Sequence, residues 1–535
     1  MLLISAAALF SSPSFNSNRF FSGIAVIATL ESLYCMGQYG GWFKSQNILF
    51  PVTGSWVNPN VTAMFLALAI PVFLFLFRSK YGRISQFSFI ILVAALYLLK
   101  CRAALIGAVV SAVLFYGLEY QFINWLKNKK NRFTLRALII IGILIIIPLG
   151  STLYNAKKAS AEGRKFIWKI SSLMILDKPL TGYGYGYFEK EYNLFQADYI
   201  QKGKATAKEL ENAGPVEVAH NEFFQNAVEG GFLGLFLASL FFGSLLFTIR
   251  QRKKIDTHEI DSIAEDVLSA KANDDYFNAS YAAVIGFIAM SFFEFTMQAI
   301  PVMGLLTIYS AVVCSKLKPL QLSSKPTFLE NNKIFSIVFK IAIILMGLHL
   351  LCLVIRIAGA DRQNKKASLF KNEGRYEKAM KIMPALAPYL KGDSNYWKNY
   401  GSLYFSGGNY PSAIVCLAQA KKTSSSCELY LGMGICYEKL KQYPAAIAQY
   451  KQLVSLHPGK FSYRFRLMNT YLKSKDTLKT IAAAQGILDL HPKIPSDKVL
   501  YYKRQAVRVL SSLRAKPVPI NRVQPAANHF LQNKE

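Results

Sequence analysis

The chain has 535 residues, of which 52% are hydrophobic and 13% aromatic, and its formal net charge is +31. Its apolar residues form long blocks, which excludes a soluble multidomain protein of this length and indicates a multi-pass membrane protein with a polar tail. Much of the Lys and Arg stands in short clusters between these blocks, a pattern of membrane-protein loops rather than of a nucleic-acid-binding surface. The seven cysteines are scattered without metal-ligand spacing, so neither a metal site nor a disulfide framework is predicted.

Long apolar segments are the first predicted elements along the chain. A helix needs roughly 20 residues to cross the ~30 Å hydrocarbon core of a bilayer. The segments that approach this length are 20–38, 61–77, 84–100, 103–123, 135–152, 230–249, 281–299, 302–315 and 334–356. The sequence therefore predicts an all-α fold, with a polytopic transmembrane helical bundle over residues 1–357.

Clusters of Lys and Arg between these segments give the predicted orientation. The positive-inside rule places in the cytoplasm the clusters at 78–83, 127–132, 250–254 and 316–318. The segments left on the opposite side are 39–60, the turn at 100–102, a long loop at 152–229, the turn near residue 301 and everything after residue 356. Every polar motif described below is therefore predicted on one outer face of the membrane.

The chain after residue 357 becomes polar and repetitive. Three residues recur after 33 positions, and the pairs are Gly401 with Gly434, Tyr410 with Tyr443, and Pro411 with Pro444. This spacing is typical of tetratricopeptide repeats, in which small residues let paired helices approach and prolines limit helices. We predict an α-solenoid over 358–515 and a flexible tail at 516–535.

The predicted solenoid suggests an interaction surface, because such repeats bind partners and seldom carry out chemistry. Its basic residues outnumber the acidic ones by roughly three to one. The candidate ligands are therefore a protein partner and anionic lipid or glycolipid headgroups. An ordinary solvated basic face explains the same composition.

Arg102 and Arg164 are the basic residues with the clearest functional interpretation. Arg102 stands between two apolar runs, where an ionisable side chain is costly enough to suggest a role. The alternative is an arginine that snorkels to the membrane interface. Arg164 begins a short amphipathic helix that contains Trp168, and the glycine- and tyrosine-rich segment that follows includes Tyr183 and is able to lie close against a ligand. Trp168 and Tyr183 are candidates for contacting substrate.

His220 is the candidate general base. It is one of six histidines in the chain, and imidazole accepts protons near neutral pH. Asn221 and Glu222 beside it, and Glu217 three residues earlier, are candidates for orienting the ring and contacting substrate. The alternative is a structural histidine that satisfies loop carbonyls. Glu294, inside an apolar run, is predicted to pair with a basic residue.

Two arginines and one histidine on an outer membrane face suit group transfer from a lipid diphosphate. The diphosphate leaving group needs charge neutralisation, which guanidinium groups supply through paired hydrogen bonds. The acceptor hydroxyl has a high pKa and gains from a base in the range of histidine. No paired-Asp motif occurs on this face, so a metal-bound nucleotide-sugar site is not predicted and no cofactor is expected.

Four blocks of the sequence together resemble the O-antigen ligase and polymerase superfamily. They are 53–60 before a span, 101–105 at a span start, 163–168 with the turn 179–184, and 219–221 with 229–234. The resemblance covers about residues 50–315. It implies a helical fold of the GT-C kind in the bacterial inner membrane, with the loop and the repeats in the periplasm, and an undecaprenyl-diphosphate-linked glycan as donor.

The resemblance also implies roles for individual residues. Arg102 and Arg164 match the arginines that hold the lipid diphosphate. His220 matches the histidine that activates the acceptor hydroxyl, with inversion at the anomeric carbon and without a metal ion. Two features depart from the family pattern: Cys101 replaces the usual Ser or Thr, and early spans are partly missing, which leads us to expect that the chain starts after the family's first helices.

Three acceptors remain open within this superfamily. They are lipid A core, a growing O-antigen or other surface polysaccharide, and protein. A repeat domain outside the membrane would recruit a protein acceptor or an assembly partner, which favours the last two. The non-enzymatic alternative is a membrane-anchored repeat scaffold or a glycan transporter, and substitution of His220 by Ala separates it from an enzyme.

Overall fold

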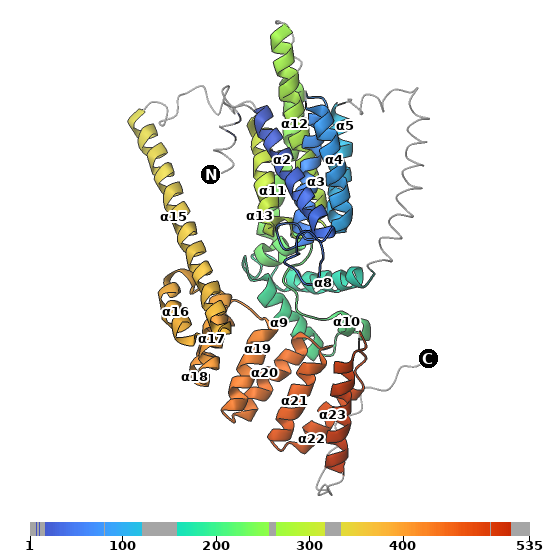
Figure 1. Ribbon diagram of the computed structural model, residues 1–535, viewed down its shortest axis with the longest axis vertical. Coiled ribbons are helices and arrows are strands. Elements are labelled where there is room, and N and C mark those ends of the chain that lie inside the picture. The colour runs from blue at the N-terminus through green and yellow to red at the C-terminus, as the bar shows by residue number, and fades with distance from the viewer. Residues whose placement is uncertain are drawn as a thin grey trace. The chain divides into compact units, whose positions relative to one another are not determined.

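The computed structural model describes residues 7, 10, 17–79, 81–119, 158–255, 264–315, 333–492 and 494–514 (Figure 1). The regular elements in these ranges are all helices, which confirms the predicted all-α fold. The chain forms two compact units. The first contains residues 1–192 and 216–354, and the second contains residues 193–215 and 355–535.

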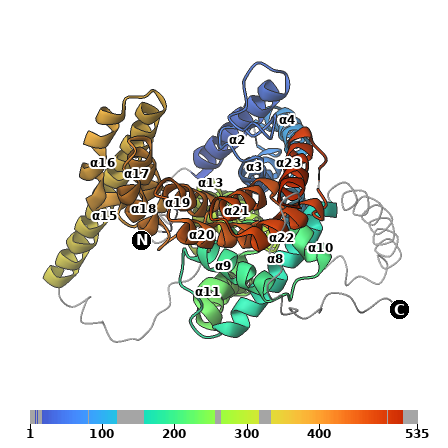
Figure 2. The same ribbon diagram turned by 90° about the horizontal axis from the view of Figure 1, so that it is seen from below.

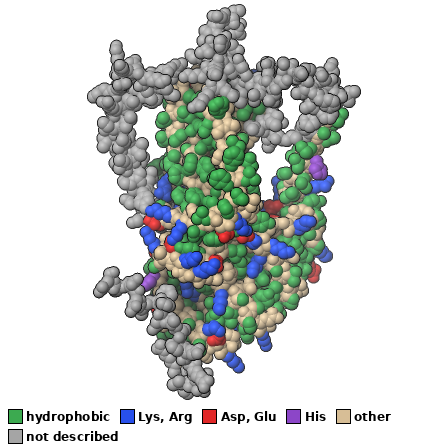
Figure 3. Space-filling model, turned by 180° about the vertical axis from the view of Figure 1, so that it is seen from behind, with side chains coloured by type: hydrophobic (Ala, Val, Ile, Leu, Met, Phe, Trp, Pro, Cys, Tyr) green, Lys and Arg blue, Asp and Glu red, His purple; other side chains and the backbone are tan. Residues whose placement is uncertain are grey.

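The first unit contains a helix bundle. One helix, α3 (Pro59–Leu76), is buried along nearly its whole length, because it is apolar on all sides and packs against α2, α4, α5, α12 and α13. On the face shown in Figure 3, the outer surface of the bundle is covered with hydrophobic side chains. The other helices of the bundle are α2 (Ser17–Tyr39), α4 (Gly82–Leu99), α5 (Arg102–Glu119), α11 (Glu222–Ile255), α12 (Ala264–Ser291) and α13 (Ile300–Ser315).

Six described helices are long and apolar enough to cross a membrane. They are α2, α3, α4, α5, residues Glu222–Ile249 of α11, and residues Ile344–Asn372 of α15 (Lys333–Asn372). Helix α13 is apolar but shorter. The chain is therefore a multi-pass membrane protein, as its composition predicted.

One predicted span differs from the structure. The segment 281–299 was expected to be a single helix, but α12 ends at Ser291. The residues after Ser291 form a turn and the short 3-10 helix η2 (Thr296–Gln298) before α13 begins. Backbone groups of this turn bind side chains from other segments, which a continuous helix would not allow.

The described part of the long loop, residues 158–229, contains three helices before α11 begins at Glu222. The amphipathic helix expected around Arg164 is α8 (Lys158–Asp177), which packs against α11. The glycine- and tyrosine-rich segment after it has no regular structure. It leads into α9 (Phe188–Gln201) and α10 (Ala207–Asn212).

The second unit contains the helical repeats, which Figure 2 shows as a row of paired helices. Gly401 and Gly434 lie where one helix crosses the next, and a Cβ atom on Gly434 would lie 2.3 Å from the Tyr450 ring. Pro411 and Pro444 each occupy the second position of a helix, where proline is favoured. The helices are α16 (Tyr376–Leu390), α17 (Ser394–Ser406), α18 (Tyr410–Ala420), α19 (Cys427–Lys439), α20 (Tyr443–Leu456), α21 (Phe461–Lys473), α22 (Thr477–Leu488) and α23 (Asp497–Arg514).

Some predictions concern residues that the structure does not describe. The expected span 135–152, the basic clusters 127–132 and 316–318, and the tail 516–535 lie outside the described residues. The outer orientation of the loop and of the repeats stays a prediction.

Candidate functional site

Arg164 makes two short contacts with the turn that follows α12. Its Nη2 atom lies 2.5 Å from Glu294 Oε1, and its Nη1 atom donates to the Phe293 carbonyl oxygen at 2.6 Å. The residues lie 130 and 129 positions apart in the chain. The guanidinium group is thus fixed in direction by one carboxylate and one backbone carbonyl, which suits its planar geometry.

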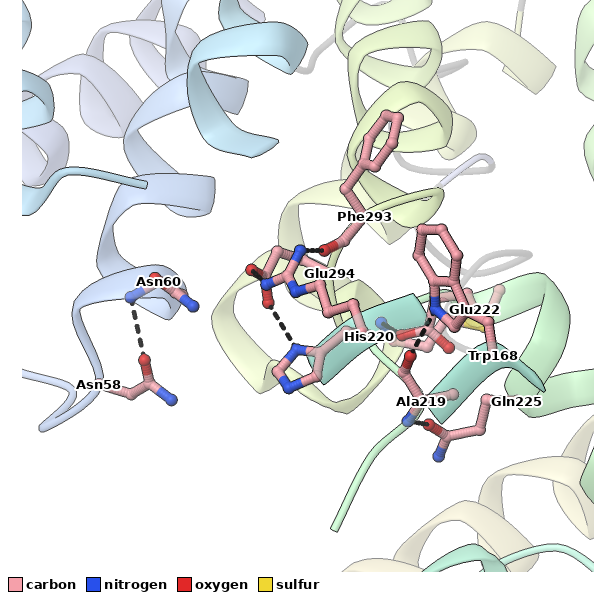
Figure 4. Close-up of polar contacts among 11 residues, drawn as sticks. Asn58, Asn60, Trp168, Ala219, His220, Glu222, Gln225, Phe293 and Glu294 are labelled. Atoms are coloured by element: carbon pink, nitrogen blue, oxygen red, sulfur yellow. Dashed lines mark hydrogen bonds and ion pairs between the residues drawn. The ribbon is translucent and has the colours of Figure 1, made fainter. Parts of the chain in front are cut away.

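Glu294 joins Arg164 to His220. Its second oxygen, Oε2, lies 3.4 Å from His220 Nδ1 (Figure 4). The Glu294 side chain is 4% exposed, so its charge requires partners of this kind. Burial on its own raises the pKa of Glu294, but the His220 contact and the charge of Arg164 outweigh it and lower this pKa below its usual value. Glu294 is therefore a buried carboxylate that remains ionised.

The backbone on the N-terminal side of His220 is held at both polar groups of Ala219. Trp168 Nε1 donates to the Ala219 carbonyl oxygen at 3.0 Å, and Ala219 N donates to Gln225 Oε1 at 3.1 Å (Figure 4). The Trp168 ring also stacks on Phe224, with ring centres 5.9 Å apart. His220 itself has a φ of 51°, a left-handed conformation that costs on the order of 1–3 kcal/mol in a residue with a side chain. The surrounding contacts hold it in that conformation.

Asn221 and Glu222 tie the His220 segment to the turn after α12. Asn221 Oδ1 accepts from Phe223 N and Phe224 N and so caps α11, while its Nδ2 donates to the Phe292 carbonyl oxygen at 3.0 Å. Glu222 Oε1 accepts from Met297 N at 2.7 Å. Asn221 and Glu222 therefore position the site. Among the described residues, the carboxylate in contact with the His220 imidazole is that of Glu294.

The glycine- and tyrosine-rich segment interlocks with a break in α11. Gly231 has a φ of 61°, and a Cβ atom there would lie 2.4 Å from the Leu180 carbonyl. The break frees Phe232 N to donate to the Pro179 carbonyl oxygen at 2.7 Å. Glu229 Oε1 accepts from Gly186 N at 3.1 Å. This interlock joins the end of α8, which carries Arg164, to α11, which begins just after His220.

Tyr183 and Glu217 lie at the border of this arrangement. Tyr183 N donates to the Val228 carbonyl oxygen at 2.9 Å, and its hydroxyl donates to Asp177 Oδ2 at 2.6 Å. Partial burial and the bond to Asp177 raise the pKa of Tyr183. Glu217 is exposed.

Arg102 is the first residue of α5, which packs closely on α12. A Cβ atom on Gly107 would lie 2.4 Å from Met290, and one on Gly286 would lie 3.0 Å from Ser111. Because the earlier residue of α5 pairs with the later residue of α12, the two helices run antiparallel. Arg102 therefore lies at the end of the pair where α12 leads into the turn that holds Arg164.

The block at 53–60 forms the entry to α3. Asn58 Oδ1 accepts from Asn60 N at 2.9 Å and so caps the helix (Figure 4). Glu31 of α2 is buried and accepts from Ser55 N and Ser55 Oγ at 2.7 and 2.8 Å. These contacts give the block a structural role.

Two regions of the chain match known families. Residues 87–239 match the family described as O-antigen ligase, and residues 428–459 match the family described as tetratricopeptide repeat. The chain therefore has one region similar to O-antigen ligases and one region similar to tetratricopeptide repeats. No curated protein sequence matches the chain.

The region that matches O-antigen ligases contains most of the site. Arg102, Arg164 and His220 fall inside residues 87–239, whereas Glu294 lies beyond that match. The sequence predicted that Glu294 pairs with a basic residue, and its contact with Arg164 confirms this. Its second contact, with His220, was missed because nothing in the spacing of residues 220 and 294 brings them together. The only signal was an ionisable residue within an apolar run.

Solved structures with a partial match to the chain include a protein with tetratricopeptide-like repeats. The structure titled MamA AMB-1 is 16% identical, covers 30% of this chain and 91% of its own, and has a TM-score of 0.24. A kinesin light chain repeat protein of Podosopora anserina is 14% identical, with coverage of 30% and 94% and the same TM-score of 0.24. The Cut9–Hcn1 tetramer of APC/C is 12% identical, with coverage of 83% and 63% and a TM-score of 0.24.

Proposed function

We propose that the protein is a glycosyltransferase of the bacterial inner membrane that moves a glycan from undecaprenyl diphosphate to a hydroxyl acceptor on the periplasmic face. The observation that carries the proposal is the contact of one buried carboxylate, Glu294, with both Arg164 and His220. Such a carboxylate orients a base and fixes a cation in one site, and both residues lie in the region that matches O-antigen ligases. The basic clusters between spans support the orientation.

His220 acts as the general base in this proposal. Because Glu294 is ionised, it favours a proton on Nδ1 of the imidazole and leaves Nε2 to accept one. The 3.4 Å contact is long for a hydrogen bond, and contacts of this kind tighten when substrate binds. As the acceptor oxygen bonds to the anomeric carbon, its proton passes to Nε2. The bond from that carbon to the diphosphate oxygen breaks, and the electron pair stays on the diphosphate.

Arg164 and Arg102 neutralise the leaving diphosphate. The contacts of Arg164 with Glu294 and Phe293 use two of the five N–H groups of the guanidinium, so others are available to phosphate oxygens. Its side chain is 19% exposed, enough to meet a ligand at the edge of the site. Arg102 lies at the matching end of the α5–α12 pair. Loss of diphosphate then needs no metal ion, because two guanidinium groups carry the charge.

The other predicted site residues divide into two groups. Trp168, Asn221 and Glu222 hold the backbone on either side of His220 and position the base. Tyr183 and Glu217 lie at the border, where hydroxyl and carboxylate groups suit hydrogen bonds to sugars. We assign them to the glycan. The repeats would recruit a protein acceptor or partner, in keeping with their family match.

Transfer of an undecaprenyl-diphosphate-linked glycan in membranes tests the proposal. Wild type, His220→Ala and Arg164→Ala would be compared, with lipid, polysaccharide and protein fractions separated so that the shifted fraction names the acceptor. We expect product from wild type and a loss of roughly 100-fold or more in both variants. His491→Ala, which removes an exposed histidine of the second unit, is the matched control. Equal product from all variants would favour a scaffold or a transporter instead.

A further inference from the structure

A part of the long loop belongs to the second unit. Residues 193–215 group with the helical repeats, although the chain before and after them belongs to the first unit. The boundary falls within α9, after Tyr192, and the segment continues through α10 to Pro215. Only four residues separate Pro215 from His220. The segment 193–215 therefore belongs to the second unit, and the chain returns from it to the first unit just before the candidate base.

The apolar residues of this segment complete a core of the repeats. Ala197 is 0% exposed and lies in the same hydrophobic cluster as Leu417, Tyr430 and Leu453. Leu194 packs against this cluster. Figures 1 and 2 both show α9 beside the repeat helices. The repeats thus bury one face of α9 as they bury their own helices.

Polar contacts fix the segment in register. Gln201 Nε2 donates to Ser455 Oγ at 2.9 Å and to Gln452 Oε1 at 3.3 Å, both on α20. Gln196, which is 1% exposed, donates from Nε2 to the Gly214 carbonyl oxygen at 3.0 Å and closes the segment on itself. A buried amide with a defined hydrogen-bond partner favours one position of the segment over positions shifted along the repeats. The surface is specific in shape and in hydrogen bonding.

We propose that this surface of the repeats binds the chain's own loop segment 193–215 and thereby holds the segment that carries His220. The partner of the α18–α21 surface is then internal, and an acceptor or assembly protein would use other faces of the solenoid. Anchoring both ends of a loop near a catalytic base reduces the conformations it samples, and small displacements of such a group are costly to the rate. The effect on transfer rests on the proposed function, whereas the docking itself does not.

Ala197→Arg in the full-length protein tests the inference, because the new side chain does not fit a fully buried position. Hydrogen exchange would be followed in peptides from 193–215, 216–224 and α22–α23, together with glycan transfer. We expect exchange in the first two regions to rise at least tenfold, no change in α22–α23, and a fall in transfer of about tenfold. Ala482→Arg, at an exposed position of α22, is the matched control and should behave as wild type.

The outcomes separate docking from activity. Rapid exchange of 193–215 already in wild type, or opening of this segment with exchange in 216–224 and transfer both unchanged, would overturn the inference. If Ala197→Arg also raises exchange in α22–α23, the milder variant Gln201→Ala tests the inference instead. Gln201→Ala removes the two hydrogen bonds to α20. It should raise exchange in 193–224 only and lower transfer two- to fivefold. If wild type makes no product, the proposed function fails, and the exchange measurements still decide whether the repeats hold the loop.

Discussion

The candidate site and the helical repeats are built in different ways. Glu294 contacts residues 74 and 130 positions away in the chain. In the repeats, Glu438 accepts hydrogen bonds from Tyr450 and Thr470, which are 12 and 32 positions away. Contacts within the repeats recur with the sequence period, since Gly401 lies against Leu417 and Gly434 lies against Tyr450. The site, in contrast, exists only when the turn after α12 meets α8 and the His220 segment. Single changes in the site should therefore abolish transfer and leave the repeats folded. Single changes in the repeats should loosen the repeats and leave the contacts of the site in place.

Glu294→Gln should have the largest effect on transfer. The amide keeps the shape of the side chain but loses the charge that orients His220 and pairs with Arg164. We expect the transfer rate to fall by roughly 10²- to 10⁴-fold, with hydrogen exchange in the repeats unchanged. Glu217→Gln in the same assay distinguishes the two glutamates. A greater loss from Glu217→Gln than from Glu294→Gln would make the loop glutamate the partner of His220 and contradict our assignment.

Gly231→Ala should disrupt the interlock between α11 and the segment after α8. A Cβ atom would lie 2.4 Å from the Leu180 backbone, and the residue has a positive φ, so the change costs about 1–3 kcal/mol locally. We expect transfer to fall about tenfold or more as Arg164 and His220 lose their relative position. Gly243→Ala, in open space on the same helix, should retain transfer within about twofold. Equal rates for both variants would show that the interlock does not position the site.

Gly434→Ala should weaken the repeats instead. The added methyl group meets the Tyr450 ring at 2.3 Å, and overpacking of this kind costs about 1–3 kcal/mol. Hydrogen exchange in α19 and α20 should accelerate about tenfold or more, since 1.4 kcal/mol corresponds to a factor of ten. Gly459→Ala, which meets no atom within 4 Å, serves as the control. Unchanged exchange in both variants would mean that these helices are not packed through Gly434.

Glu438 gives the smallest expected effect, a pH dependence confined to the repeats. Burial on its own raises the pKa of Glu438, but hydrogen bonds from Tyr450 and Lys473 outweigh it and lower this pKa below its usual value. The stabilisation is therefore present above the unfolded-state pKa of about 4.3 and is lost as the pH falls through the folded-state value. Glu438→Gln should be less stable than wild type by about 1–3 kcal/mol at pH 7 in thermal unfolding. This difference should shrink below pH 4; a constant difference would contradict the ionised state.

The sequence predicted the elements that follow from local patterns. Apolar length identified the bundle helices, and the recurrence of Gly401 as Gly434 identified the repeats. Arg164 and His220 were singled out by residue type and order. The contact between His220 and Glu294 depends on where α12 ends, which apolar length alone placed too late. The docking of Ala197 on the repeats was also not predictable, because one small apolar residue in a polar loop carries no periodic signal.

The most direct test of the central claim is a double-mutant cycle on transfer with His220→Ala, Glu294→Gln and the two combined. Because Glu294 acts in part through His220, the loss in the double variant should be well below the product of the two single losses, since residues that act as a unit have non-additive effects. Losses that multiply, with the double variant slower by the product of the two single effects, would show that Glu294 and His220 act independently and would contradict the account.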